Sequence, residues 1–353
     1  MSIPSTMRGA MLLGPEHIEI QNIPVPQPGR GEALLKIGAA TTCGTDVKVF
    51  RRGGHPRMLK VPTLFGHEMA GEIAAIGEEV HDVAVGDRVV VANSAPCGEC
   101  QYCLAGRENL CTDLHYLNGA FSEYLALPER FVRRSLYSLP DSLSFARAAL
   151  TEPLACVLHG SDACDVARYA KAPDAQAIVL GGGPIGLLFV AVLARRGIDV
   201  LLADPNPSRL EVGIRMGASS TAAIQRGGGQ AEHLLGLTAD GLGAHIVVDC
   251  TGIPEVWADA LNLARPGGLV NLFGGCAPGT QVPLDTHRVH YSEITIKGVY
   301  HHRPHTFSQA LSLLSDPSFP ADVLLTCKSK LDGIEQALQA MINKQALKVV
   351  ISS

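Results

Sequence analysis

The chain has 353 residues, more than a single hydrophobic core usually holds, so we expect two domains. Apolar residues make up 46% of it, alongside 37 glycines and 22 prolines, which is typical of a globular α/β protein with many turns and argues against a disordered chain. The net charge of −5 and the scattered basic residues argue against a nucleic-acid or anionic-membrane partner.

No apolar run is long enough for a signal peptide or a membrane span, so we expect a cytoplasmic protein. In that reducing compartment the ten cysteines are not expected to form disulfides. A regular spacing of cysteines therefore indicates metal or redox chemistry first.

The first 150 residues or so consist of short strands broken by turns. Apolar or alternating runs at 32–40, 68–77, 87–93 and 121–128 are bounded by Gly, Pro and Asp. This pattern predicts a β-rich barrel or sandwich.

From about Gln176 the pattern changes to buried strands that alternate with helices. Strands are predicted at 176–183, 198–205, 244–252 and 269–275, and helices at 184–197, 208–218 and 254–268. This alternation predicts a doubly wound parallel sheet covered on both faces. Further strands at 292–300 and 346–352 and a helix at 306–315 follow, without a linker or repeat.

The sequence "VLGGGPIG" follows the strand that begins at Gln176 and starts the next helix. Gly181, Gly183 and Gly186 match the dinucleotide-binding pattern, in which the first glycine makes the turn, the second admits a pyrophosphate and the third lets helix and strand approach. We expect Pro184, Ile185 and Thr251 to contact the cofactor as well. An ordinary strand-to-helix turn is the alternative.

Asp204 ends the strand that follows this helix. It stands near the place of the acid that accepts both hydroxyls of the adenosine ribose, and its charge would repel a 2′-phosphate. NAD is therefore predicted in preference to NADP.

Four cysteines lie within one short segment, at spacings of three, three and eight residues. They are Cys97, Cys100, Cys103 and Cys111. Four thiolates can close a tetrahedron around Zn²⁺ and leave no position for water, which predicts a structural zinc site. Iron–sulfur ligation is the alternative, but its usual spacings differ.

A second set of zinc ligands is dispersed along the chain. Cys43, His67 and one carboxylate, from Glu68 or Glu152, would neutralise Zn²⁺ and leave one position open for water or substrate. Binding both carboxylates would weaken the Lewis acid, so the two glutamates are expected to alternate. Thr45 is expected to pass on the substrate proton, and Asp46 to accept a hydrogen bond from His67.

The motifs "CGTD", "GHE", the four-cysteine segment, "EPLA", "GGGPIG" and "IKGVY", in this order, resemble the zinc-dependent medium-chain alcohol dehydrogenases, particularly the sorbitol (polyol) and threonine dehydrogenase branch. The resemblance implies a GroES-like catalytic domain made from 1–153 and 291–353 and a Rossmann NAD-binding domain at 154–290. It also implies a homo-oligomer, either a dimer or a tetramer. Within the family, Cys43, His67 and Glu68 or Glu152 correspond to catalytic zinc ligands, Thr45 to the start of the proton relay, and Asp204 with Arg209 to NAD binding.

Several positions differ from the sorbitol dehydrogenase pattern. Lys48 stands at the place of a relay histidine, where it would either relay the proton as a neutral amine or steer the anionic cofactor. Phe50 stands where larger aromatics occur, and His301 and His302 follow Tyr300 where an arginine–tyrosine pair is usual. We list Phe50, His301 and His302 as candidate substrate contacts; packing at a subunit contact is the alternative for the two histidines.

The expected activity is reversible oxidation of a polar secondary alcohol, such as a polyol, sugar or cyclitol, to a ketone with hydride transfer to NAD. The alternatives are an activity like that of L-threonine 3-dehydrogenase, the zinc-free reduction of alkenes or quinones, and a non-catalytic NAD-binding protein. The ligand and relay candidates argue against the last two.

Overall fold

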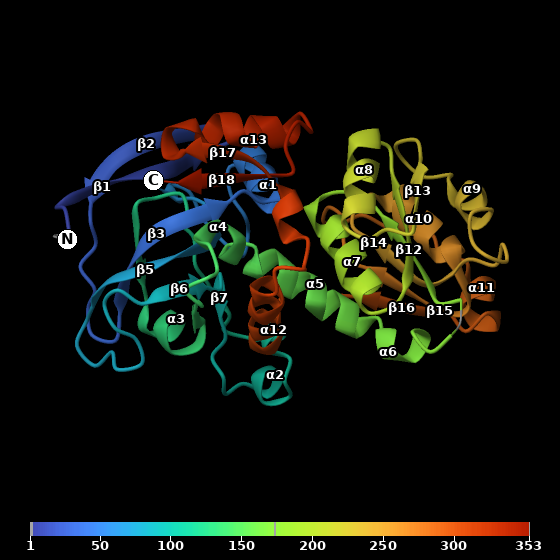
Figure 1. Ribbon diagram of the computed structural model, residues 1–353, viewed down its shortest axis with the longest axis horizontal. Coiled ribbons are helices and arrows are strands. Elements are labelled where there is room, and N and C mark those ends of the chain that lie inside the picture. The colour runs from blue at the N-terminus through green and yellow to red at the C-terminus, as the bar shows by residue number, and fades with distance from the viewer. Residues whose placement is uncertain (1–2, 173, 353) are drawn as a thin grey trace. The chain divides into compact units, whose positions relative to one another are not determined.

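The computed structural model describes residues 3–172 and 174–352, which form two compact units (Figure 1). Unit 1 comprises Met1–Ala155 and Arg303–Ser353, and unit 2 comprises Cys156–His302. Both ends of the chain therefore contribute to unit 1. The second boundary lies after residue 302 and not after 290, because strand β16 (Thr295–Gly298) pairs with a strand of unit 2.

Unit 1 is rich in β-structure, and its main sheet has seven strands. They follow the order β10-β6-β5-β3-β18-β17, with β9 also paired to β3. The bounds are β3 Ala33–Thr41, β5 Glu68–Ile76, β6 Arg88–Val91, β9 Tyr124–Leu127, β10 Leu136–Ser138, β17 Leu325–Lys330 and β18 Lys348–Ser352. The C-terminal β18 pairs antiparallel with β3, so Val350 lies opposite Thr41 (Figure 1, red beside blue).

Two smaller sheets complete the β-structure of unit 1. One has the order β2-β1-β4 and the other is the pair β7-β8. The bounds are β1 Thr6–Gly14, β2 His17–Pro24, β4 Thr63–Leu64, β7 Ser94–Ala95 and β8 His115–Tyr116.

The helices of unit 1 are short. They are α1 Gly44–Arg52, α2 Gln101–Leu104, α3 Glu129–Arg134, α4 Phe145–Ala148, α12 Pro304–Ser315 and α13 Ile334–Ile342, with 3₁₀ turns at Glu108–Leu110, Ala321–Leu324 and Leu331–Gly333. Helix α5 (Thr151–Ala163) starts in unit 1 and ends in unit 2. A large cluster of buried apolar side chains in this unit includes Phe50, Phe65 and Phe121, and a smaller separate cluster contains Met7, Val25 and Leu34.

Unit 2 contains a six-stranded sheet in which every neighbouring pair of strands is parallel, in the order β13-β12-β11-β14-β15-β16. This is the strand order of the Rossmann fold. The bounds are β11 Gln176–Leu180, β12 Asp199–Asp204, β13 Ser220–Ala223, β14 Ala244–Asp249, β15 Ala264–Leu272 and β16 Thr295–Gly298. The predicted class, a β-rich domain with a doubly wound parallel-sheet domain, is confirmed.

The helices of unit 2 alternate with these strands. They are α6 Val166–Tyr169, α7 Pro184–Arg195, α8 Pro207–Arg215, α9 Ala231–Leu235, α10 Pro254–Leu263 and α11 Thr286–Tyr291. The helix predicted at 254–268 ends earlier, at Leu263. Its predicted last turn contains Pro266, which has no amide hydrogen for the helix, and Gly267 at a φ of 74°. The segment from Ala264 joins β15 instead.

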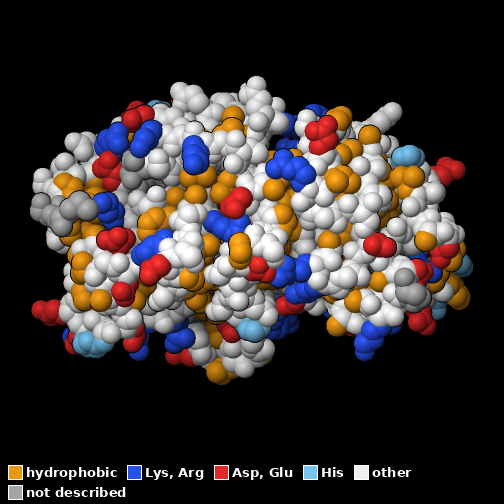
Figure 2. All heavy atoms as spheres, in the orientation of Figure 1, with side chains coloured by type: hydrophobic (Ala, Val, Ile, Leu, Met, Phe, Trp, Pro, Cys, Tyr) orange, Lys and Arg blue, Asp and Glu red, His pale blue; other side chains and the backbone are white. Residues whose placement is uncertain are grey.

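Acidic and basic side chains are interspersed over the face of the molecule in view (Figure 2), in agreement with the scattered charges of the sequence. Among the described residues, no helix combines the length and the apolar character needed to cross a bilayer.

Candidate functional site

The segment 65–68 places a buried histidine and a buried glutamate beside the apolar core of unit 1. Phe65 is fully buried and packs edge-on against Phe121, with ring centroids 5.6 Å apart. Gly66 has a φ of 90°, and a Cβ atom there would lie 2.7 Å from the Phe121 ring. A glycine is therefore needed for the turn that separates Phe65 from His67. Glu68 then begins β5.

Cys43 is held at the start of α1 by a capping box. Its backbone amide donates to Asp46 Oδ2 at 2.8 Å, and its Sγ accepts from the Thr45 amide at 3.4 Å. The capping box therefore fixes the direction of the Cys43 side chain at the start of α1.

His67 is buried and oriented by Asp46. The Nδ1 atom of His67 lies 2.9 Å from Asp46 Oδ1, and the two side chains are 4% and 1% exposed. Burial lowers the pKa of His67, but Asp46 and Cys43 raise it more, so it is well above its usual value. With Nδ1 bonded to Asp46, Nε2 is the ring atom that remains for a metal, which is the arrangement expected of an outer carboxylate.

The structure brings together Cys43, His67 and Glu68, whose ligand atoms all lie within 4.8 Å of one another. A thiolate, an imidazole and a carboxylate are the donors that zinc prefers, so these residues fit the metal. Of this group His67 and Glu68 are buried and Cys43 is partly exposed, which leaves one side accessible.

Glu68 is bonded through both of its oxygens. Lys348 Nζ lies 2.7 Å from Oε1 and 2.5 Å from Oε2, and the hydroxyl of Thr41 also donates to Oε2. Burial lowers the pKa of Lys348, but the carboxylate of Glu68 raises it above its usual value. The sequence interpretation missed Lys348. The signal was a lysine at the start of an apolar strand, where charged residues are rare unless paired.

Glu152, the alternative carboxylate ligand, lies in the first turn of α5 and is buried, with an exposed fraction of 7%. Its Oε1 accepts from Asn93 Nδ2 at 3.1 Å. The structure does not place Glu152 in the group formed by Cys43, His67 and Glu68. Asn93 was also missed, because a single asparagine at the end of a strand carries no distinctive pattern.

Helix α1 carries the other three predicted residues of this region. Thr45 is half-buried in its first turn, one turn before the exposed Lys48 and on the same face. Phe50 is fully buried within the core of unit 1. Its side chain is a packing residue of the apolar face of α1, so the structure gives no support for contact between Phe50 and a substrate.

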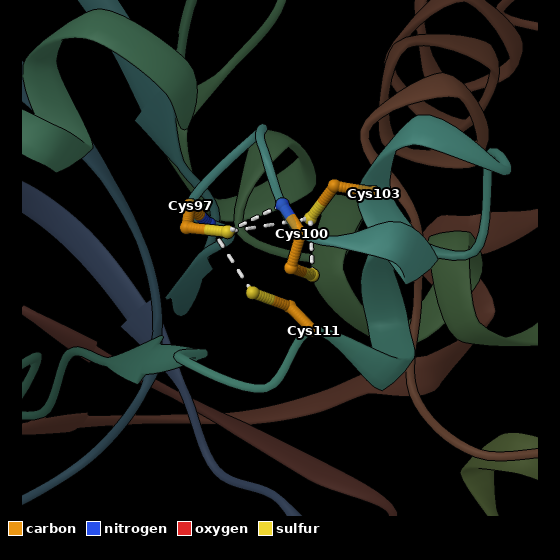
Figure 3. A group of neighbouring side chains, drawn as sticks. All are labelled: Cys97, Cys100, Cys103 and Cys111. Atoms are coloured by element: carbon orange, nitrogen blue, oxygen red, sulfur yellow. Dashed lines mark hydrogen bonds between the residues drawn. The ribbon is translucent and has the colours of Figure 1, made fainter.

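The four cysteines of the 97–111 segment converge, with their side chains pointing to one centre (Figure 3). The Sγ atoms of Cys97 and Cys103 are 3.9 Å apart, and those of Cys100 and Cys103 are 3.6 Å apart. A tetrahedron with zinc–sulfur bonds of about 2.3 Å has edges of about 3.8 Å. These two distances, and the fact that all four Sγ atoms lie within 4.8 Å of one another, fit a zinc site.

Backbone amides around this cluster compensate its negative charge. The amides of Glu99 and Cys100 donate to Cys97 Sγ, and those of Cys97 and Asp113 donate to Cys111 Sγ, at 3.3–3.5 Å. Backbone amide donation lowers the pKa of Cys100 to about 5 and also lowers the pKa of Cys97, whereas burial raises the pKa of Cys103 to about 12 and raises that of Cys111.

In unit 2, each glycine of the turn after β11 has the geometry that its predicted role requires. Gly181 has a φ of 102°, a Cβ on Gly186 would lie 1.9 Å from the carbonyl oxygen of Gly181, and a Cβ on Gly183 would meet nothing within 4 Å. The turn, the close approach of α7 to β11 and an open cradle at the helix N-terminus are all present. Pro184 and Ile185, in the first turn of α7, are partly exposed beside it.

Asp204 lies against this turn at the end of β12. Its Oδ2 accepts from the Gly182 amide at 2.7 Å and its Oδ1 from the Asn206 amide at 2.7 Å. Arg209 is close by, since a Cβ on Gly182 would lie 3.0 Å from Arg209 Cβ. Thr251, which follows β14, is also close to the turn, because a Cβ on Gly181 would lie 2.9 Å from Thr251 Cγ2. The predicted cofactor residues therefore surround one turn.

His301 and His302 end unit 2 with their rings 4.0 Å apart. His301 has a φ of 62°, and its carbonyl oxygen lies 2.7 Å from His159 Nδ1. His302 is buried.

The comparisons with known proteins agree with this geometry. The alcohol dehydrogenase GroES-like domain matches residues 29–141, and the zinc-binding dehydrogenase domain matches residues 184–316. The sorbitol dehydrogenase of Bacillus subtilis strain 168 is 32% identical over 99% of this chain and 98% of its own, and the L-galactonate-5-dehydrogenase of Escherichia coli strain K12 is 30% identical over 99% of both.

Among solved structures, a protein from Sinorhizobium meliloti 1021, assigned as a zinc-binding dehydrogenase and solved with NADP bound, superposes with a TM-score of 0.89. It shares 28% identity and covers 99% of this chain and 100% of its own. The chain belongs to the zinc-dependent medium-chain alcohol dehydrogenases, in the branch of the polyol and threonine dehydrogenases.

Proposed function

We propose that the protein is a zinc-dependent dehydrogenase that reversibly oxidises a polar secondary alcohol, such as a polyol, sugar or cyclitol, to a ketone with NAD as hydride acceptor. The observation that carries this proposal is the group of Cys43, His67 and Glu68, with His67 held by Asp46. These residues belong to a chain that also contains a dinucleotide-binding turn.

Cys43, His67 and a carboxylate from Glu68 or Glu152 would hold the catalytic zinc, and the four cysteines of the 97–111 segment a structural zinc. When bound, the catalytic zinc supplies a Lewis acid that makes the substrate hydroxyl more acidic. Asp46 keeps Nδ1 of His67 protonated and fixes the direction of the ring.

Thr45 is the residue proposed to accept the hydroxyl proton of the substrate. Its amide is bonded to Cys43 Sγ, which places the threonine beside the ligand group. Lys48, one turn further along α1, is exposed and is proposed either to carry the proton to solvent or to attract the anionic cofactor. A weaker, salt-sensitive NAD affinity in Lys48→Ala with an unchanged pH profile would identify the second role.

The cofactor is proposed to bind with its pyrophosphate at Gly183, Pro184 and Ile185 and with its adenosine ribose at Asp204. Amides at the N-terminus of α7 would bind the pyrophosphate, and the nicotinamide supplies the hydride acceptor. The Asp204 carboxylate would accept from the ribose hydroxyls in place of a backbone amide, with Arg209 and Thr251 adjacent.

His301 and His302 remain proposals for substrate contact, since imidazoles bind hydroxyl groups well. We further propose a cytoplasmic location and a homo-oligomer, either a dimer or a tetramer, the assembly that the resemblance to the family implies.

A substrate screen tests the proposed function directly. Zinc-replete protein is incubated with NAD and a panel of polyols, aldonic acids, cyclitols and L-threonine, and NADH formation is followed. We expect turnover of at least one polyhydroxylated secondary alcohol; turnover of L-threonine alone would support the threonine dehydrogenase alternative. NADH formation from no alcohol in the panel, with metal bound at both sites, would favour a non-catalytic NAD-binding protein.

A further inference from the structure

Asp249 is a buried carboxylate of unit 2 that the proposed mechanism does not use. It ends β14 and is 0% exposed, which makes it the most deeply buried carboxylate among the described residues of this unit, ahead of Asp204 and Asp259. Burial raises the pKa of Asp249, and hydrogen bonds from its neighbours offset only part of that rise. A buried carboxylate costs free energy unless hydrogen bonds stabilise it, so its partners indicate its role.

Both oxygens of Asp249 accept hydrogen bonds from the segment 250–253 that follows β14, which we call the Thr251 turn. Oδ1 accepts from the Thr251 hydroxyl at 2.6 Å and from the Thr251 amide at 3.2 Å, and Oδ2 accepts from the Gly252 amide at 3.0 Å. An asparagine could not make all of these bonds, because only one of its two terminal atoms is an acceptor. The carboxylate therefore determines the conformation of this turn.

The same network determines which side of Thr251 faces the glycine turn 181–186. The Thr251 hydroxyl donates to Asp249 and accepts from the Ile253 amide at 3.1 Å, so its proton is not available to a ligand. The methyl carbon Cγ2 lies on the other side, because a Cβ on Gly181 would be only 2.9 Å from it. Thr251 therefore presents its methyl group to the glycine turn.

Asp249 also joins the Thr251 turn to the segment that follows β15. The Gly274 amide donates to the carbonyl oxygen of Asp249 at 2.8 Å, and a Cβ on Gly274 would lie 2.7 Å from Asp249 Oδ2. Gly252 has a φ of 67°, and a Cβ there would lie 2.5 Å from the carbonyl oxygen of Gly275. Both segments thus need glycine to approach the carboxylate this closely.

The strand order connects the Thr251 turn to the cofactor. β11 and β14 are parallel neighbours, with Leu180 opposite Asp249, and the order of the strands reverses between them. In open parallel sheets, ligands bind outside the carboxyl ends of the strands at such a reversal. The glycine turn follows β11 and the Thr251 turn follows β14, so these two turns flank the crevice where a dinucleotide is expected.

We propose that Asp249 is a positioning residue for the dinucleotide, and that its carboxylate fixes the Thr251 turn as the wall of the crevice opposite the glycine turn. It acts through the turn and not by direct contact, because both of its oxygens accept from the turn. The inference rests on the proposed function, since it requires a dinucleotide at this site.

Titration of the full-length, zinc-replete protein with NADH, followed by the fluorescence of the bound cofactor, tests the inference without a substrate. Asp249→Asn keeps the size of the side chain but removes the acceptor for one of the bonds from the turn. We expect the Kd for NADH to rise by about tenfold or more, the value of one hydrogen bond to a charged group. We also expect faster hydrogen exchange at the Thr251 and Gly252 amides of the cofactor-free protein.

Asp259→Asn is the matched control. Asp259 is also buried, and its carboxylate also accepts from two backbone amides, those of Gly229 at 3.1 Å and Gln230 at 3.0 Å. These amides belong to the segment between β13 and α9. Asp259→Asn should therefore lower the melting temperature about as much as Asp249→Asn does, while the Kd for NADH stays near its wild-type value.

A double variant tests whether Asp249 acts through Thr251. Thr251→Val keeps the methyl group but removes the hydroxyl that donates to Asp249, so it should also weaken NADH binding. Because both substitutions disturb one turn, the loss in the variant with Asp249→Asn and Thr251→Val should be smaller than the product of the two single losses. Losses that multiply would overturn the inference, since the two residues would then act independently on the cofactor.

An unchanged Kd for NADH in Asp249→Asn, or a rise that Asp259→Asn matches, would overturn the inference, because the carboxylate would then only support the fold. If Asp249→Asn does not fold, Thr251→Val decides: weaker NADH binding at unchanged zinc content supports the inference, and unchanged binding overturns it. Wild-type protein that bound no NADH would overturn it as well. Alcohol turnover is measured separately, and its absence in protein that binds NADH would count against the proposed function and leave this result standing.

Discussion

At the scale of single residues, Cys43 combines a structural and a chemical role. It is the N-cap of α1, where its Sγ accepts from the Thr45 amide, and the same Sγ lies within 4.8 Å of ligand atoms of His67 and Glu68. In Cys43→Ser a hydroxyl can still cap the helix, but the soft sulfur donor is lost. We expect turnover to fall by more than about a hundredfold, more than the loss usually caused by an outer-shell change.

Zinc content, alcohol turnover and circular dichroism together check this prediction for Cys43. Cys327→Ser is the matched control, because Cys327 is the exposed cysteine on β17 and belongs to neither ligand group. A Cys43→Ser variant that kept both zinc ions and near-normal turnover would remove Cys43 from the site.

Gly66 is the residue whose backbone places His67. An alanine there would combine a positive φ with a Cβ only 2.7 Å from the Phe121 ring. We expect Gly66→Ala to destabilise the protein by about 1 to 3 kcal/mol and to weaken zinc binding at the Cys43 site. Urea titration measures the free energy of unfolding of this variant. The control is Gly14→Ala, which should be nearly neutral in that titration because a Cβ on Gly14 would meet nothing within 4 Å. Equal stabilities for the two variants would contradict this account of the turn.

Asp204 determines the predicted preference for NAD. Asp204→Ser removes one carboxylate that would bind the ribose hydroxyls and repel a 2′-phosphate. We expect the ratio of kcat/KM values for NAD and NADP to fall by about ten- to a hundredfold, the value of one or two hydrogen bonds to a charged group. Asp199→Ser, at the opposite end of β12, is the control, because Asp199 is exposed. Wild-type protein that used NADP as efficiently as NAD would contradict the role assigned to Asp204.

At the scale of elements, the 97–111 segment has almost no apolar core of its own. It contains only α2 and a single 3₁₀ turn, held together by four converging cysteines. A closed four-cysteine zinc site contributes directly to folding. We expect Cys100→Ser to lower stability by about 2 kcal/mol or more while NAD binding is retained. Thermal unfolding and NAD titration check this, and an unchanged melting temperature would show that zinc does not hold the segment.

Elements with a strong pattern were predictable from the sequence. The alternating strand and helix segments of unit 2 and the apolar strands β3, β5, β6 and β9 overlap the predicted ranges, although α10 ends at Leu263 and β15 begins at Ala264. The strand β13 was missed, because Ser220–Ala223 contains only small residues and is a strand through its pairing with β12. The pattern of residues within a segment cannot predict a strand that forms only because it pairs with a neighbouring strand.

The residues of the candidate site likewise fall into those that the sequence identified and those that only the structure shows. Cys43, His67 and the four cysteines carry their chemistry in their residue types and spacing, so sequence identified them. The pairing of Lys348 with Glu68 joins positions 280 residues apart through the antiparallel contact of β18 with β3. No periodicity within either segment encodes that contact, and only the assembled sheet shows it.

At the scale of the whole molecule, the proposed metal sites and the proposed cofactor turn belong to different compact units. Both ligand groups lie in unit 1, and the Gly181 turn lies in unit 2. Metal binding should therefore stabilise unit 1, while the six-stranded sheet of unit 2 depends on its own core. Removing zinc should act on one unit far more than on the other.

Hydrogen exchange on the full-length chain tests this expectation. After removal of zinc by a chelator, we expect exchange to speed up in the 97–111 segment and near Cys43 and His67, because local opening no longer has to displace a bound metal. Amides of β11 and β12 should keep their protection, and adding NAD to the metal-free protein should slow exchange at the Gly181 turn. Readdition of zinc is the control and should restore protection in unit 1 alone. Equal loss of protection in both units would mean that they unfold as one cooperative body, and faster exchange confined to unit 2 would contradict the assignment of the ligands.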